Sequence, residues 1–84
     1  MSDKKAGQWD DTSRRAFIAG FLRGARAGSK YHKNLSAAAR RAGIAPSRLH
    51  QFERAELLPT AEELRTLCEL IYDVDPEFAV GVLD

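Results

Sequence analysis

Residues 36–54 read SAAARRAGIAPSRLHQFER, and this stretch decides the fold. Its first half is rich in alanine, the strongest helix former. Gly43 ends that run, because glycine is favoured in the left-handed conformation that closes many helices. Pro46 suits the first position of a new helix, since its φ is already fixed near the helical value. The stretch therefore predicts two short helices, over residues 37–42 and 46–54, joined by a tight turn.

Helical patterns continue upstream of this stretch. Apolar residues recur at helical spacing up to Gly28. The pattern begins near residues 10–13, where Asp, Asp, Thr and Ser are good N-cap and first-turn residues. Residues 28–34 lack apolar periodicity and contain Gly and Asn, so they predict a loop.

Two further helices are expected downstream. Thr60 and Glu63 have the spacing of a capping box. The helix that they begin carries one apolar stripe, formed by Leu64, Leu67, Cys68 and Ile71. Pro76 can begin a short fifth helix over residues 76–83. Because no segment alternates polar and apolar residues as a strand would, the sequence predicts an all-α fold of four to five helices.

Charge is divided unevenly along the chain. The 84 residues carry a formal net charge of +1. Residues 14–54 hold ten basic residues and one acidic residue, a net +9, whereas residues 55–84 hold eight acidic residues and one basic residue, a net −7. This division predicts a basic surface that binds a polyanion and an acidic surface that faces away from it. The simpler alternative is a helical protein with solvated charged faces.

The two central helices have the arrangement of a helix-turn-helix, which places its second helix in the DNA major groove. Three residues support this interpretation together. Ala39 is small enough to let the helices approach, Gly43 permits a positive φ in the turn, and Leu49 anchors the second helix in the core. We therefore expect the chain to bind DNA.

Residues 35–78 resemble the Cro and phage-repressor family, also called XRE-type helix-turn-helix proteins. After the motif come, in the family's order and spacing, Glu53-Arg54-Ala55, Pro59-Thr60 and an amphipathic segment over residues 64–75. The resemblance covers about half of the chain. It implies a lambda-repressor-like DNA-binding domain.

The resemblance also implies which side chains contact bases. It places Ala45, Pro46, Ser47, Arg48, His50 and Gln51 on the exposed side of the second helix. Leu49 and Phe52 then face inward. Arg48 and Gln51 are the preferred base contacts, because Arg can bond guanine bidentately and Gln can bond adenine bidentately. Ser47 and His50 are further candidates, with His50 expected nearer to a phosphate.

Six residues that border the second helix are the candidate phosphate contacts: Ser36, Lys30, Lys33, Arg40, Arg41 and Arg54. Ser36 is also expected to cap the first helix of the motif. Phosphate contacts supply affinity that depends on salt and not on sequence. Taken singly, each basic residue is about as well explained as an ordinary exposed charge.

Three departures from the family pattern stand out. Ala55 occupies a position where glycine is usual, and the loop over residues 28–34 is longer than the usual link. Leu35 stands where the family often has a phosphate-contacting glutamine, so that contact is expected to shift to Ser36 or to a loop lysine.

The length allows one small domain. We expect a flexible N-terminal segment over residues 1–11, the DNA-binding domain over residues 12–75, and a short C-terminal helix or tail over residues 76–84. Small domains often share stability with a partner subunit, so a homodimer is expected. The candidate dimer contacts are Phe78, Val80, Val82 and Leu83, with Trp9 as a further one. The alternative is that these residues complete the core of a single chain.

These features together predict a homodimeric transcriptional repressor of a bacterial, phage or plasmid type. Its two recognition helices would lie about 34 Å apart on an inverted-repeat operator, and repression would follow from promoter occlusion. One alternative is an interaction module, an antitoxin or co-repressor, that binds a protein through its acidic half. Another is a restriction-modification controller protein with the same fold.

Several other functions are not expected. No pattern of a nucleophile with its base, of paired catalytic carboxylates or of a phosphate-binding glycine loop is present, so we predict no enzyme, no cofactor and no small-molecule ligand. His32 and His50 lack partners at metal-binding spacing. Cys68 is the single cysteine and lies on an apolar stripe, which favours a buried thiol over a redox sensor. With no apolar run of about 20 residues and a polar start over residues 1–7, we expect a cytoplasmic protein.

Overall fold

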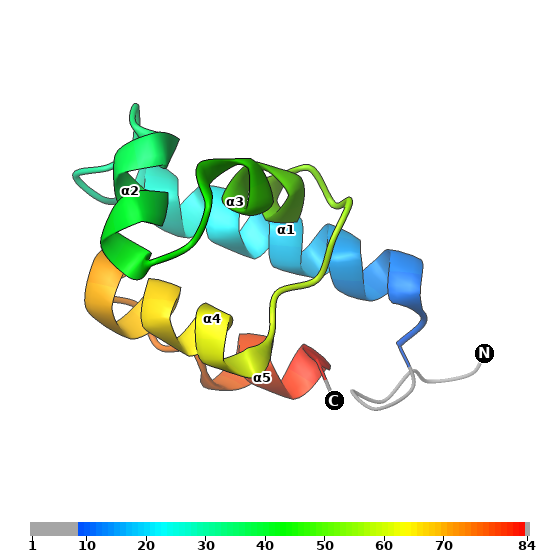
Figure 1. The fold of residues 1–84 in the computed structure, drawn as a ribbon. Coiled ribbons are helices and arrows are strands. Elements are labelled where there is room, and N and C mark those ends of the chain that lie inside the picture. Colours follow the sequence, from blue (N-terminus) through cyan, green and yellow to red (C-terminus); the bar gives the residue numbers. More distant parts are fainter. Residues whose placement is uncertain (1–8, 84) are drawn as a thin grey trace.

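The computed structural model describes residues 9–83, and every regular element in that range is a helix (Figure 1). In chain order these elements are α1 (Asp11–Ala27), α2 (Leu35–Ala42), α3 (Pro46–Glu53), α4 (Ala61–Thr66), the π-helix η2 (Leu67–Tyr72) and α5 (Glu77–Leu83). The predicted all-α fold is confirmed. Of the segments expected at the two ends, residues 1–8 and 84 lie outside the described residues. Within residues 9–83, no helix combines the length and the apolar character needed to cross a membrane.

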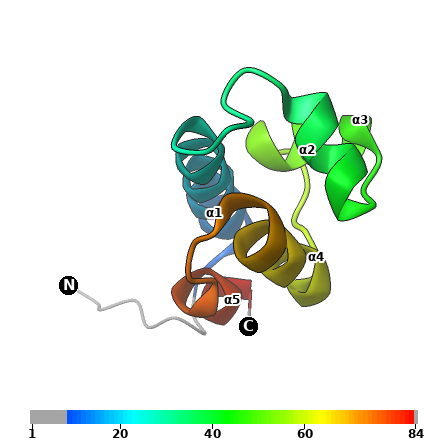
Figure 2. The ribbon, with the colours of Figure 1, turned by 90° about the vertical axis from the view of Figure 1, so that its left-hand side faces the viewer.

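α1 is the longest helix, and α3, η2 and α5 pack against it. Asp10 caps its start by accepting a hydrogen bond from the backbone N of Ser13 at 2.7 Å. The helix stops before Gly28, as predicted. Ile18 and Leu22 are fully buried on its inner face. Figure 1 shows α1 running behind α3, and Figure 2 shows it beside α5 at one edge of the molecule.

The first helix of the motif begins earlier than expected. α2 starts at Leu35, and its cap is Asn34 rather than Ser36, because Asn34 Oδ1 accepts a hydrogen bond from the backbone N of Ala37 at 3.0 Å. The loop sets this position, since the backbone N of Asn34 donates to the carbonyl of Tyr31 at 2.9 Å. Asparagine and serine are about equally good caps, so loop geometry decides between them.

The helix downstream of Thr60 changes its winding halfway. The predicted capping box is present: Thr60 Oγ1 accepts from the backbone N of Glu63 at 3.1 Å, and Glu63 Oε1 accepts from the backbone N of Thr60 at 2.8 Å. In η2 each backbone hydrogen bond spans one more residue than in an α-helix, so the side chains that follow are rotated relative to an α-helix. Tyr72 consequently enters the core, whereas Ile71, which was expected on the buried stripe, is only partly buried.

The C-terminal helix completes the core of this chain. Val82 is fully buried and Val80 is 8% exposed. Val80 and Val82 were predicted to contact a second subunit, with the core of a single chain as the alternative, and in this structure both side chains pack inside their own domain. Leu83 is partly buried, and Phe78 is 66% exposed.

One hydrophobic core joins the helices. Its largest fully buried side chains are Ile18, Leu22, Leu49, Phe52, Leu64, Leu67, Cys68 and Val82. Leu49 and Phe52 come from α3 and face inward as predicted. Because the inner side of α3 is fixed in this way, its opposite side is left to solvent.

Candidate nucleic-acid interface

The turn between α2 and α3 has the geometry that the motif requires. Gly43 adopts a φ of 75°, in the left-handed region that favours glycine. Its backbone N donates to the Arg40 carbonyl at 3.1 Å, and the backbone N of Ile44 donates to the Ala39 carbonyl at 2.9 Å. Ala39 and Leu49 are fully buried. The predicted roles of Ala39, Gly43 and Leu49 are therefore confirmed.

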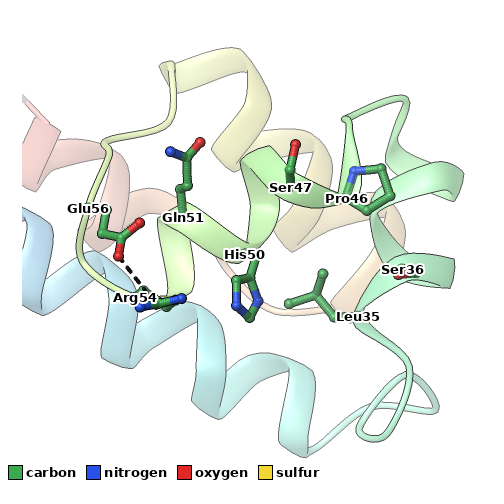
Figure 3. Close-up of a pocket in the computed structure, with 8 residues that line it drawn as sticks. All are labelled: Leu35, Ser36, Pro46, Ser47, His50, Gln51, Arg54 and Glu56. Carbon is green, nitrogen blue, oxygen red and sulfur yellow. Dashed lines mark ion pairs between the residues drawn. The ribbon is translucent and has the colours of Figure 1, made fainter.

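The outer side of α3 is polar. Ser47, His50, Gln51 and Arg54 are exposed and lie on one side of the helix. Together with the start of α2 they form an open groove, shown in Figure 3, whose other lining residues are Leu35, Ser36, Pro46 and Glu56. In this view Ser47 and Gln51 point to the same side of α3, and His50 lies toward Leu35. Three predicted base contacts are thus grouped on one accessible face.

The fourth predicted base contact, Arg48, is engaged with the protein. Its Nε and Nη2 donate to the two carboxylate oxygens of Glu63 at 2.7 and 3.1 Å. Its guanidinium also lies 5.2 Å from the centre of the Phe52 ring. The hydrogen bond from Arg48 lowers the pKa of Glu63, and the same bond raises the pKa of Arg48, so the pair is fully ionised near neutral pH. Arg48 therefore faces α4 and does not line the groove beside Ser47 and Gln51.

A second, basic groove adjoins the first between α1, the loop over residues 28–34 and α3. Its lining residues are Arg23, Arg26, His32, Lys33, Leu35, His50, Glu53 and Arg54. Two predicted phosphate contacts, Lys33 and Arg54, are brought together here. Arg54 also forms an exposed ion pair with Glu56 at 3.3 Å. Arg23, which was not among the predicted phosphate contacts, lines the same groove.

The remaining phosphate candidates are distributed more widely. Ser36 lines the first groove and is partly buried, and the exposed Arg40 lies one turn further along the same side of α2. Arg41 is exposed on that helix as well. Lys30 lines a different groove, between the end of α1 and η2, and its Nζ lies 5.5 Å from the centre of the Tyr31 ring. The structure therefore does not bring Lys30 to α3.

A buried ion pair holds α3 to α1. The Nε and Nη2 of Arg26 donate to the two carboxylate oxygens of Glu53 at 2.7 and 2.8 Å, and its Nη1 donates to the carbonyls of Tyr31 and His32. Arg23 Nη1 also donates to the Glu53 carbonyl at 2.6 Å. The hydrogen bond to Glu53 is the main reason that the pKa of Arg26 is raised. These contacts fix the C-terminal end of α3 and the loop in one arrangement.

One feature of the sequence points to this pair. Glu53 is the one acidic residue among ten basic residues in residues 14–54. Within the described structure it is also the one charged residue that is buried, at 5% exposure. A single acid in a basic segment needs a partner when it is buried, because an unpaired buried charge is strongly unfavourable.

Ala55 occupies its expected turn in a strained conformation. Its φ is 61°, in the left-handed region, and the backbone N of Glu56 donates to the Gln51 carbonyl at 3.0 Å to close the end of α3. For a residue with a Cβ this region costs about 1–2 kcal/mol. The departure from glycine therefore leaves the turn in place and adds strain to it.

The division of charge along the chain becomes a division in space. Figure 1 shows α2 and α3 on one side of the molecule and α4 and α5 on the other. α2 and α3 belong to the segment with net charge +9, and α4, η2 and α5 belong to the segment with net charge −7. The polar side of α3 therefore lies on the basic side of the domain.

The comparisons with known proteins agree with this geometry. A family model described as a helix-turn-helix domain matches residues 18–79, which includes most of α1 and all of α2, α3, α4 and η2. No curated protein and no solved structure shows significant similarity to the chain. The matched segment contains the turn at Gly43, the second helix of the motif (α3) and the Arg26–Glu53 pair. The chain belongs to the helix-turn-helix domain family, and this membership indicates a DNA-binding regulator.

Proposed function

We propose that the chain is a sequence-specific transcriptional repressor that binds an inverted-repeat operator as a homodimer. The observation that carries the proposal is the exposed polar side of α3, grouped by a well-formed turn on the basic side of the domain. A side chain on a helix in the major groove can distinguish all four base pairs through their hydrogen-bonding edges. Ser47, His50 and Gln51 have the exposure and the chemistry for this role.

Phosphate contacts would come from the basic groove and from α2. Lys33, Arg54 and Arg23 line one groove beside α3. Ser36 lines the adjoining groove together with Arg54, and Arg40 is exposed on α2. A duplex laid along α3 would bring phosphates near both grooves. Arg41 remains a candidate from its exposure, and Lys30 is the weakest candidate because it lines a separate groove.

The proposed dimer surface is the aromatic cluster formed by Trp9, Phe17, Phe21 and Phe78. The Phe17 ring centre lies 5.5 Å from that of Trp9, 6.1 Å from that of Phe21 and 5.4 Å from that of Phe78. Phe78 remains 66% exposed, and large exposed aromatic residues are typical of subunit interfaces. A second copy of this chain is the proposed occupant, because an inverted repeat requires two recognition helices related by a twofold axis.

Phe78→Asp tests this surface, with Leu70→Asp as its matched control. Leu70 is 76% exposed on η2 and lies outside the aromatic cluster. Sedimentation equilibrium is expected to show a dimer for the parent and for Leu70→Asp, and a monomer for Phe78→Asp. A dimer that is lost only in Leu70→Asp would contradict the proposed surface.

Repression would follow from occupation of a promoter, in the cytoplasm for a regulator of bacterial, phage or plasmid type. The test is the affinity for a selected duplex of Gln51→Ala and Ser47→Ala. Each is expected to lose about tenfold or more of its preference for that duplex, because a good side-chain contact to a base contributes about 1–3 kcal/mol. Glu69→Ala, an exposed change on η2, is the control and should bind like the parent. Equal binding by Gln51→Ala, Ser47→Ala and the parent would refute base reading by α3.

The second candidate is a protein-binding module such as an antitoxin or co-repressor. The exposed Leu70 in the acidic segment of the chain favours it, because a large exposed apolar side chain suits a protein partner. Under this proposal Leu70→Asp removes partner binding while Gln51→Ala leaves it unchanged. A restriction-modification controller would bind DNA like the repressor and differ only in activating one promoter.

A further inference from the structure

Arg48 and Glu63 form a polar clamp between the recognition helix and α4. Arg48 donates from Nε and Nη2 to both oxygens of Glu63 and lies over the Phe52 ring. Glu63 is held in turn, because the same Oε1 that accepts from Arg48 also accepts from the backbone N of Thr60. The carboxylate is therefore fixed by the start of α4 and cannot follow Arg48 toward solvent without breaking its capping bond.

The clamp holds Arg48, the one arginine within α3, whose guanidinium can hydrogen-bond guanine. The side chains of Arg48 and Glu63 are 39% and 21% exposed, so the pair lies at the edge of the surface and is accessible to a ligand. In a helix, position 48 lies about 100° around the axis from position 47, toward α4 and away from the centre of the polar side. Both the helical position and the ion pair direct this guanidinium away from Ser47 and Gln51.

We propose that Glu63 is a specificity determinant of the proposed DNA-binding function, which withholds Arg48 from the bases. Ser47, His50 and Gln51 then read the operator, and Arg48 positions α3 on α4. A fixed carboxylate at this edge also opposes the approach of a phosphate by direct repulsion. Neutralising Glu63 frees Arg48 to contact guanine or phosphate, so it changes the preferred sequence as well as the affinity.

The experiment compares Glu63→Gln with Glu62→Gln. Both remove one negative charge from the first turn of α4, but Glu62 is exposed and outside the clamp. Glutamine can keep the capping bond to Thr60, so the fold is expected to persist in Glu63→Gln. Arg48→Gln and the double variant Arg48→Gln/Glu63→Gln complete the set. Each is used to select sequences from a random duplex pool and is then titrated with salt on a mixed-sequence duplex.

The clamp predicts that the parent, Arg48→Gln and Glu62→Gln select the same sequence. Glu63→Gln should gain about a tenfold preference for guanine at one position of each half-site. Its salt dependence should steepen by about one released ion relative to Glu62→Gln. The double variant should lose both gains. If Arg48→Gln alone loses a base preference, Arg48 reads DNA with the clamp closed and the proposal is overturned.

Two further outcomes separate this inference from the proposed function on which it rests. If no variant selects a sequence, base reading by α3 is wrong. A steeper salt dependence of binding to mixed-sequence DNA in Glu63→Gln than in Glu62→Gln would still support release of Arg48 from the clamp. If Glu63→Gln and Glu62→Gln behave alike in both assays, the clamp has no role in binding. Should Glu63→Gln fail to fold, Arg48→Gln decides the matter, because the clamp predicts that its selected sequence is unchanged.

Discussion

Replacing Glu53 with Ala should destabilise the domain more than any exposed charge substitution. The change removes both hydrogen bonds from Arg26 and the acceptor that neutralises it. The side chains of Glu53 and Arg26 are only 5% and 19% exposed. Breaking a buried pair from one side typically costs about 3–5 kcal/mol, whereas an exposed pair contributes less than about 1 kcal/mol.

The expected loss lies between these limits, at about 2–3 kcal/mol, because Arg26 keeps its bonds to the carbonyls of Tyr31 and His32. A domain of 84 residues has a total stability of about 4–12 kcal/mol, so this loss is a large share of it. With an m-value of about 1–1.5 kcal/mol per M, the urea midpoint should fall by about 2 M. Far-ultraviolet circular dichroism, which reports helix content, follows the unfolding transition.

Two comparisons make this measurement decisive. Glu56→Ala breaks the exposed pair with Arg54 and should change the free energy of unfolding by less than about 0.5 kcal/mol. The double variant Arg26→Met/Glu53→Met should be more stable than Arg26→Met alone, because it leaves no charge unpaired. If the free energy of unfolding of Glu53→Ala lies within about 0.5 kcal/mol of that of the parent, the buried pair does not hold α3 to α1.

Four further predictions concern capping, strain, pH and thiol reactivity. Asn34→Ala should lower the free energy of unfolding by about 1 kcal/mol through loss of the cap of α2, while Ser36→Ala should have a smaller effect. Urea denaturation of both variants checks this, and a larger effect of Ser36→Ala would contradict the cap assignment. Ala55→Gly should raise the melting temperature, because about 1–2 kcal/mol of left-handed strain is relieved against about 0.4–1 kcal/mol of added freedom in the unfolded chain; a lower melting temperature would show that the strain is absent. The pKa of Glu63 is lowered in the folded state, so its contribution to stability is present above pH 4.5 and disappears as the pH falls through the lowered pKa. The difference in urea midpoint between the parent and Glu63→Gln should therefore shrink from about pH 6 to about pH 3. A difference that stays constant would argue against the ionised pair. Burial raises the pKa of Cys68 to about 11, so a thiol reagent at pH 8 should label it only as fast as the domain unfolds, and immediate labelling of the native protein would contradict its position in the core.

Much of the fold follows from local signals in the sequence. Gly43 and Pro46 mark the turn and the start of α3, and Thr60 with Glu63 marks the start of α4. Each signal acts through a backbone requirement that few residues can meet: a positive φ, a missing N–H donor or a reciprocal cap. Residues with such requirements are informative in isolation, and their positions were predicted correctly.

The errors arise where several arrangements satisfy the same local rule. Asn34 and Ser36 are both good caps, and the loop hydrogen bond to Tyr31 selects the first. A simple α-helical stripe placed Ile71 in the core, but the π-helical turn rotates Tyr72 there instead. Both outcomes depend on the path of the backbone through the whole domain, which periodicity does not describe.

The sequence predicted which side chains lie on the exposed side of α3, but it did not predict the ion-pair partners of the arginines. Ser47, His50 and Gln51 lie together on the exposed side of α3, while Arg48 is bound by Glu63, a residue 15 positions away. Arg26 and Glu53 are 27 positions apart. Helical spacing shows which side of a helix a residue occupies, but a long arginine side chain selects its partner from the tertiary structure.

The central claim, that α3 reads operator DNA for a pair of chains, is tested most directly by selecting bound sequences from a random duplex pool. The selected duplex is then titrated at several salt concentrations, and the number of chains bound per duplex is measured. The expected result is a palindromic site that binds two chains, with affinity that falls steeply as salt increases. Weak binding without sequence preference would contradict it and would favour the protein-binding alternative.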